Sequence, residues 1–245
     1  MKPLSLAFAL SIGLSAAACS GDSKSVETAS GLRADSAGGL VEAPTTPYRP
    51  TDAEASTALV VTLVGDTAAQ APPAACTTTG EPSPATVFWV DGLREGKPLP
   101  NERRYELVNG PCGLEPRLQA TVVGGAINVF NDAGAHKLVF VRAGTTDTLQ
   151  TMPFALSGSV VATDRLTRIA GVVEVKCTMH PGEKAYIAVF DHPYFGVASS
   201  GDKVTLDAIP PGDYRVMTWH EGLAAPVAVP AKVSASGQTE LIVRQ

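Results

Sequence analysis

Short apolar runs rich in Val, Ile, Phe and Tyr recur along most of the chain. Turn-forming pieces such as Gly124-Gly125 and Pro210-Pro211-Gly212-Asp213 separate them. No long segment repeats its apolar residues at the spacing of a helix. Many short strands at fairly regular spacing predict an all-β sandwich or barrel. The predicted strands are residues 59–64, 86–90, 119–123, 127–130, 138–141, 171–176, 185–190 and 214–219.

The first residues have the layout of an export signal. Lys2 is followed by the apolar run 4–14, by small residues at 15–18 and by Cys19. Cys19 has two interpretations: a chance residue just past an ordinary cleavage site, or the lipid-bearing first residue of the mature protein. The second follows from a resemblance to bacterial lipoprotein signals, although these usually have Leu where this chain has Ala16. Acyl chains on Cys19 would hold the exported protein on the periplasmic face of the cell envelope, at the outer membrane.

Residues 20–58 are dominated by Ser, Gly, Ala, Thr, Pro and Asp and contain almost no aromatic residues. Such a segment cannot bury enough apolar surface to offset the entropy of ordering it, so we predict a disordered tether. Beyond the leader, no apolar run approaches the length of about 20 residues that spans a bilayer. We therefore expect contact with a membrane through the lipid anchor alone.

The 245 residues include 19 Lys and Arg against 24 Asp and Glu, a formal net charge of −5. A mildly acidic chain lacks the basic surface that nucleic acid binding requires, so nucleic acid is not an expected partner. The sequence contains no Gly-x-Ser-x-Gly, no His-Glu-x-x-His and no phosphate-binding glycine loop. We therefore do not expect an enzyme.

The cysteines raise the question of pairing. If Cys19 carries lipid, an odd number remains in a compartment that oxidises thiols: Cys76, Cys112 and Cys177. Cys76 lies in a Pro/Thr-rich loop and Cys112 in the turn 109–113, so both are available for a disulfide, and we favour the pair Cys76–Cys112. Other pairings, including Cys177 with either loop cysteine, stay open.

Cys177 ends a predicted strand and opens the sequence Cys177-Thr178-Met179-His180-Pro181. A thiolate and an imidazole three positions apart can point at one metal ion. Cysteine sulfur with two histidine nitrogens is the ligand set of mononuclear blue-copper sites. His136, in a loop that leads into the predicted strand 138–141, is well placed to supply the second imidazole.

Each of these residues also has an interpretation without a metal. His136 is compatible with a loop histidine bonded to a strand end, Cys177 with a buried thiol, and His180 with a turn residue. We interpret His192 and His220 as structural, because each lies beside an aromatic residue in a β-rich segment.

A longer string of motifs is more specific than the cysteine and histidine spacing alone. The motifs are Val87-Phe88-Trp89-Val90-Asp91-Gly92, Cys112-Gly113-Leu114-Glu115-Pro116-Arg117, Asn131-Asp132 before His136, Val173-Glu174-Val175-Lys176-Cys177 before His180-Pro181, and Ala185-Tyr186-Ile187-Ala188-Val189. In their order these motifs resemble the cupredoxin-like domain of exported bacterial proteins, of the plastocyanin-like or methylamine-utilisation-like type, over about residues 59–245. The resemblance implies a Greek-key β-sandwich or barrel, a copper ion held by His136, Cys177 and His180, and electron transfer to a redox protein partner.

One position departs from that family's pattern. Methionine often stands three residues after the second histidine in the family, whereas this chain has Glu183. A carboxylate is a harder ligand than a thioether and favours Cu(II). Copper is therefore the expected cofactor, with Glu183 either an axial ligand that lowers the reduction potential or a side chain directed into solvent. Met179 is expected to face away from the metal.

Residues 204–216 resemble the later strands of carboxypeptidase-regulatory-like, transthyretin-type β modules, which are scaffolds that sometimes bind carbohydrate-like ligands. We predict an export signal at 1–19, a tether at 20–58, a cupredoxin-like domain at 59–190 and a small β-sandwich extension at 191–245. Two alternatives concern that boundary: strand 185–190 serves both units, or residues 59–92 supply the first strands of the extension.

Two functions from different classes fit these features. The first is an exported copper protein that transfers electrons. The alternative is a metal-free β-sandwich module at the cell envelope that binds a cell-surface glycan or a protein partner. A fold alone does not choose between them.

Overall fold

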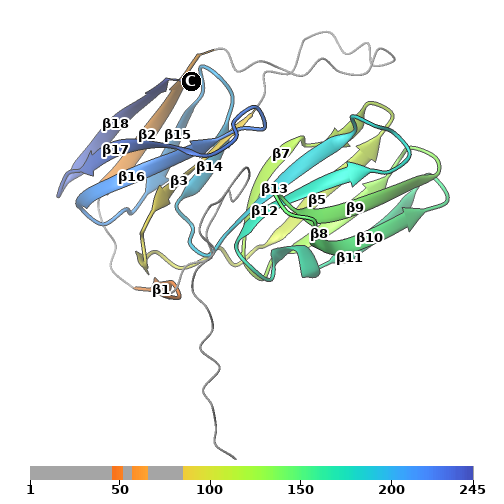
Figure 1. The fold of residues 1–245 in the computed structure, drawn as a ribbon. Coiled ribbons are helices and arrows are strands. Elements are labelled where there is room, and N and C mark those ends of the chain that lie inside the picture. The colour runs from red at the N-terminus through yellow and green to blue at the C-terminus, as the bar shows by residue number, and fades with distance from the viewer. Residues whose placement is uncertain (1–45, 52–56, 66–84, 245) are drawn as a thin grey trace, which may run out of the picture. The chain divides into compact units, whose positions relative to one another are not determined.

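The computed structural model describes residues 46–51, 57–65 and 85–244, and in these it is almost entirely β, as predicted (Figure 1). One short 3₁₀ helix, η1 (Arg165–Thr167), is present in the described residues. The strands are β1 (Arg49–Pro50), β2 (Thr57–Val64), β3 (Thr86–Asp91), β4 (Glu95–Gly96), β5 (Arg104–Gly110), β6 (Gly113–Glu115), β7 (Leu118–Val122), β8 (Ala126–Asn131), β9 (His136–Arg142), β10 (Thr148–Phe154), β11 (Ser159–Thr163), β12 (Gly171–Cys177), β13 (Lys184–Phe190), β14 (Phe195–Ala198), β15 (Lys203–Asp207), β16 (Gly212–Trp219), β17 (Val227–Val233) and β18 (Gly237–Arg244).

Strands β5 to β13 form a first sandwich of two sheets. One sheet has the order β10-β9-β12-β13-β7 and the other β11-β8-β5-β6. The chain passes repeatedly from one sheet to the other, as in a Greek-key sandwich. It leaves the second sheet at Pro116, which lies between β6 and β7 and has no N–H to continue the ladder. A core of alternate inward-facing residues fills the space between the sheets, including Ile127 and Val129 of β8 and Val173 and Val175 of β12.

A second sandwich combines strands from the two ends of the described chain. Its sheets have the orders β14-β3-β16-β17 and β15-β2-β18. β2 and β3 lie within the range 59–190 that was predicted as the cupredoxin-like domain, yet their hydrogen-bonded partners are C-terminal strands. This pairing matches the alternative in which residues 59–92 supply the first strands of the extension. The carboxypeptidase-regulatory-like resemblance of residues 204–216 stays a prediction.

Two strands, β3 and β13, are buried on both faces, which explains why their sequences are continuous apolar runs. In β13, Ala185, Ile187 and Val189 belong to the core of the first sandwich. The alternate residues of β13, Tyr186, Ala188 and Phe190, belong instead to an apolar cluster that also contains Trp89 of β3 and Trp219 of β16. The rings of Trp89 and Phe190 lie 5.4 Å apart, and those of Tyr186 and Trp219 5.2 Å apart. Residues of both sandwiches therefore share one apolar cluster.

Parts of the segment predicted as a tether have regular structure. β1 pairs in parallel with β4, and the hydroxyl of Tyr48 donates a hydrogen bond to the carbonyl of Lys97 at 2.6 Å. β2 begins at Thr57. Residues 20–58 therefore include a short ordered stretch in which Tyr48 packs against the apolar core of the second sandwich. The rest of the predicted tether and the predicted signal, with Cys19, lie outside the described residues.

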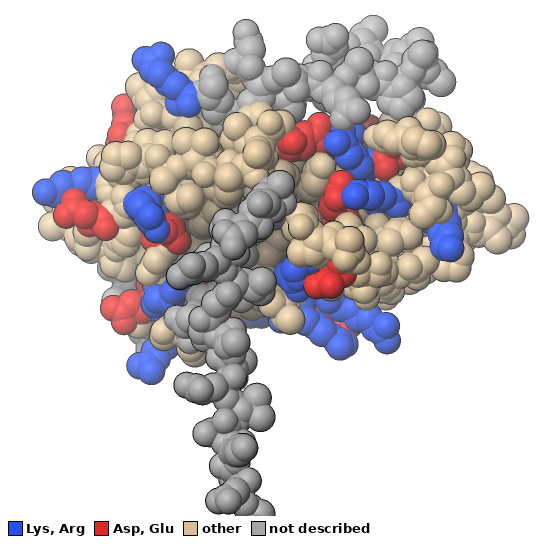
Figure 2. All heavy atoms as spheres, in the orientation of Figure 1, with Lys and Arg blue, Asp and Glu red and all other residues tan. Residues whose placement is uncertain are grey.

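Basic and acidic side chains are interspersed on the face of the molecule shown in Figure 2. Ion pairs in the described residues include Arg94 with Asp191 at 3.0 Å and Arg117 with Glu221 at 2.9 Å. In the described part of the chain, no helix combines the length and the apolar character that crossing a membrane requires.

His192 lies in the connection between β13 and β14 and is almost fully buried, with 4% of its surface exposed. Its Nδ1 accepts a hydrogen bond from the backbone N–H of Tyr194 at 3.1 Å, so this nitrogen carries no proton. Burial, helped by the positive charge of Arg94, lowers the pKa of His192 to about 4. This placement agrees with the structural role predicted for His192.

The lowered pKa of His192 predicts a loss of stability in acid. The contribution of His192 to stability is fully present above the ordinary pKa of 6.5. It is lost as the pH falls from there through the folded value of about 4, because the unfolded chain takes up the proton first. The full effect is roughly 3 kcal/mol. Replacing His192 with Asn keeps an acceptor for Tyr194 but removes the titration. The free energy of unfolding, measured with urea, should therefore fall less in the variant than in wild type between neutral pH and about pH 4.5. Equal losses in both proteins would contradict this account.

Candidate metal centre

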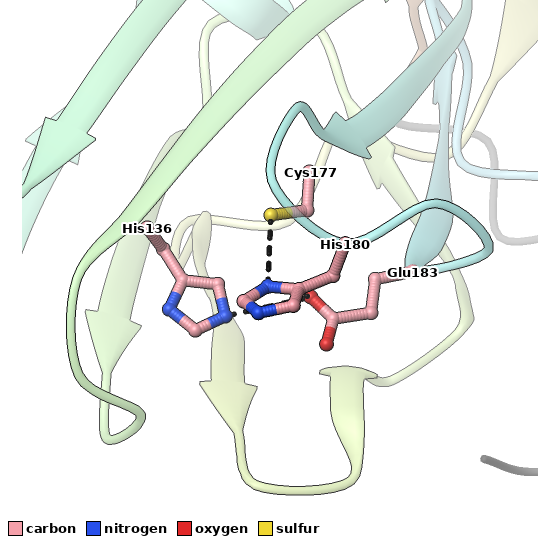
Figure 3. A group of neighbouring side chains, drawn as sticks. All are labelled: His136, Cys177, His180 and Glu183. Atoms are coloured by element: carbon pink, nitrogen blue, oxygen red, sulfur yellow. Dashed lines mark hydrogen bonds and ion pairs between the residues drawn. The ribbon is translucent and has the colours of Figure 1, made fainter.

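The structure brings His136, Cys177, His180 and Glu183 together at one end of the first sandwich (Figure 3). One nitrogen, sulfur or carboxylate oxygen from each residue can be chosen so that all four atoms lie within 4.8 Å of one another. The two imidazole rings have their centroids 4.6 Å apart. The residues predicted as copper ligands therefore converge, including the carboxylate whose role the sequence left open.

The end of β12 and the β12–β13 connection together supply three of these side chains. Cys177 is the last residue of β12, and its backbone N–H donates to the carbonyl of Glu183 at 3.1 Å. Within the connection, the N–H of Glu183 donates to the carbonyl of His180 at 3.2 Å, and Gly182 adopts a φ of +101° that favours glycine. The resulting tight loop places the Sγ of Cys177 3.5 Å from the Nδ1 of His180. Three potential ligands therefore come from seven consecutive residues.

His136 joins the group from the neighbouring strand. It begins β9, where Leu138 is the register partner of Cys177. Its Nδ1 lies 3.3 Å from the carbonyl oxygen of Gly134, and since a carbonyl only accepts, this hydrogen bond requires the proton on Nδ1. The other nitrogen, Nε2, then has a free lone pair, and it lies 3.5 Å from the Oε2 of Glu183. The tautomer of His136 therefore suits it as a ligand through Nε2.

The four side chains differ in their access to solvent. Cys177 and His136 are 6% and 7% exposed, and the side chain of Glu183 is 15% exposed. The side chain of His180 is 48% exposed. Below the group, Cys177 belongs to the same apolar core as Leu138 and Phe140. The inner side of the site is therefore apolar, and the site reaches the surface through His180.

Glu183 is the residue whose environment most directly indicates a cation. Its Oε2 is buried and has no hydrogen-bond partner in the described residues, although it lies 3.5 Å from both His136 Nε2 and His180 Nδ1. A buried carboxylate oxygen without a donor is costly unless a positive charge compensates it. The donor set of thiol, two imidazoles and this oxygen therefore fits a metal ion.

Met179 and Met152 lie in different environments. Met179 has 54% of its surface exposed. Met152 is buried in the core on β10, as the register partner of Leu138. His192 and His220 lie outside the group of four candidate ligands.

The cysteines have separate roles. Cys177 is a free thiol, so the alternative that it forms a disulfide with Cys76 or Cys112 is wrong. Cys112 is disulfide-bonded. Its favoured partner, Cys76, lies outside the described residues, and that pairing stays a prediction.

No protein-family model matches the chain, and no curated protein matches it. Similar solved structures include a purple cupredoxin from Nitrosopumilus maritimus, with 14% identity, 35% of this chain and 98% of that chain covered, and a TM-score of 0.30. They also include a dithionite-reduced auracyanin from Roseiflexus castenholzii, with 15% identity, 38% and 98% coverage and a TM-score of 0.29.

A Cu-containing nitrite reductase from Thermus scotoductus is similar over 54% of this chain and 28% of its own, with 16% identity and a TM-score of 0.31. Likenesses this weak carry no argument about function. The strand order of the first sandwich, taken by itself, shows an all-β arrangement of two sheets with Greek-key connections.

The burial of Cys177 predicts a slow thiol reaction. In the unreduced protein made without Cys19, a charged thiol reagent should modify Cys177 slowly while the chain is folded and quickly in denaturant. The variant Cys177→Ser should lose this reaction. Fast modification of Cys177 in the folded protein would show that its sulfur is not protected by the surrounding core.

Proposed function

We propose that this protein binds a copper ion through His136, Cys177, His180 and Glu183 and exchanges single electrons through it, without transforming a substrate. The observation that carries the proposal is the convergence of a free buried thiol, two imidazoles and a buried carboxylate oxygen that has no hydrogen-bond partner in the described residues. Each of these groups has a simpler explanation alone, but together they form a complete set of ligands.

The chemistry of the donors favours copper. Thiolate is a soft ligand that suits Cu(I), whereas imidazole and carboxylate suit the divalent ion, so both oxidation states find preferred donors. A bound copper ion would supply one-electron exchange between Cu(I) and Cu(II). Zinc also accepts cysteine, histidine and carboxylate ligands but has no redox chemistry. Zinc is therefore the competing metal that an experiment has to exclude.

The residues themselves have distinct tasks. Cys177 and His136, both buried, exclude water from the inner side of the site. Glu183 supplies a full negative charge, which favours the higher oxidation state and lowers the reduction potential. His180 is the most exposed of the four side chains, so its ring is where a redox protein partner would make contact.

The location of the protein is part of the proposal. Export and a lipid anchor at Cys19 would place the copper site on the periplasmic face of the cell envelope, within reach of other exported redox proteins. A metal-free module that binds a glycan or a protein is the outcome to be accepted if the copper experiment fails.

Copper titration of the chain without Cys19 tests the proposal. We expect one Cu(II) per chain and a visible thiolate-to-copper absorption band. Zinc could bind with the same stoichiometry but would not produce the band. His136→Ala and Cys177→Ser should abolish the band and weaken binding by more than the ~10–100-fold that losing an outer partner causes. His220→Ala, which changes a histidine outside the group, is the control. A folded wild-type protein without colour or stoichiometric copper would refute the proposal.

Glu183 predicts the direction of a change in reduction potential. Glu183→Met replaces a charged oxygen with a neutral thioether and should raise the potential of the copper-loaded protein, and Glu183→Gln should raise it less. Glu174→Gln, a change on β12 in a residue paired with Lys176 at 2.8 Å, is the matched control and should leave the potential nearly unchanged. Voltammetry measures all four proteins. An unchanged potential in Glu183→Met would show that Glu183 is not a ligand.

A further inference from the structure

Two asparagines are fully buried near the β8–β9 loop, which ends at His136, the first residue of β9. Asn109 on β5 and Asn131 on β8 each have 0% of their surface exposed and are register partners in the parallel pair of these strands. The Nδ2 of Asn109 donates to the Oδ1 of Asn131 at 2.6 Å. Neighbouring inward positions of the same strands hold Leu107 and Val129. An amide pair in such a core is unfavourable unless its hydrogen bonds are made, so its partners are informative.

Asn131 connects two loops at the end of the sandwich where the metal site lies. Its Nδ2 donates to the carbonyl oxygens of Gly134 and Leu156, both at 2.9 Å. Gly134 belongs to the β8–β9 loop, and Leu156 to the β10–β11 loop. The carbonyl of Gly134 is also the acceptor for Nδ1 of His136 at 3.3 Å. A carbonyl oxygen has two lone pairs and can accept both hydrogen bonds.

We propose that Asn131 is a positioning residue for His136. Its amide holds the Gly134 carbonyl where it accepts the Nδ1 proton, which keeps Nε2 unprotonated and directed at Cys177, His180 and Glu183. The effect on metal binding rests on the proposed function, whereas the tautomer of His136 is a property of the metal-free chain. Metal-ligating histidines commonly donate their other ring N–H to such an acceptor, and disturbing it typically weakens metal binding ~10–100-fold.

Asn109 offers a matched control within the same pair. Its side chain makes no bond to Gly134, and its Oδ1 has no hydrogen-bond partner in the described residues. Its backbone carbonyl accepts from the N–H groups of Asp132 and Ala133 at 2.9 and 3.1 Å, and a side-chain substitution keeps these bonds. Replacing Asn109 with Ser therefore loosens the buried pair but leaves both donors of Asn131 in place. Replacing Asn131 with Ser releases the Gly134 carbonyl.

The experiment compares wild type, Asn131→Ser and Asn109→Ser in two measurements. Imidazole ¹⁵N chemical shifts of the metal-free proteins, recorded at about pH 8 where ordinary imidazole is neutral, report which nitrogen of His136 carries the proton. Competition titration with Cu(II) reports the dissociation constant. Asn131→Asp keeps the shape and the acceptor for Asn109 but removes both donors, and it serves as a second variant if Asn131→Ser does not fold.

We expect the Nδ1–H tautomer in wild type and Asn109→Ser and a mixture of tautomers in the Asn131 variants. The dissociation constant for Cu(II) should rise ~10–100-fold in the Asn131 variants and less in Asn109→Ser. An unchanged tautomer in the Asn131 variants, or an equal change in Asn109→Ser, would overturn the proposal. A wild type that binds no Cu(II) would refute the proposed function, and the ¹⁵N comparison alone would then decide the role of Asn131.

Discussion

The antiparallel ladder that joins β12 to β9 on one side and to β13 on the other is the constraint on which the candidate site depends. Val173, Val175 and Cys177 face the same apolar core, and burying each valine contributes about 1.5–3 kcal/mol. A slip of one residue would turn all three to the opposite face of the sheet. The hydrophobic core therefore fixes the register, and the register brings the sulfur of Cys177 beside the strand that begins at His136.

Sequence periodicity predicted the class of fold because it depends on local patterns. The runs 86–90 and 185–190 were recognisable as strands, since a strand buried on both faces is apolar throughout. Which strands pair is a non-local property. β2 and β3 are separated from β14 by the whole first sandwich, and their own sequences do not state that their partners come more than 100 residues later. The short strand β11 carries two adjacent valines, of which Val160 is 53% exposed, so its sequence does not alternate between apolar and polar residues.

The site divides in the same way. Cys177 and His180 are three positions apart, so their spacing alone predicted that they lie near each other, whereas Glu183 was considered because of its place in the family pattern. His136 is distant in sequence, and its position in a loop that leads into a predicted strand made it a candidate that the order of motifs along the family then supported. Asn109 was not predicted at all. Residues 104–110 were not recognised as a strand, and without the phase of that strand an inward-facing asparagine cannot be distinguished from an ordinary turn residue.

The polar character of this end of the first sandwich is hard to explain by stability alone. Apolar side chains would pack there without hydrogen-bonding requirements, whereas Asn131 and His136 are buried and need specific partners. The chain supplies those partners to the amide of Asn131 and to the Nδ1 of His136. In the described residues, neither the Oε2 of Glu183 nor the Oδ1 of Asn109 has a hydrogen-bond partner. Of these two oxygens, that of Glu183 lies where a sulfur and two ring nitrogens meet, which is the position that a bound cation would stabilise.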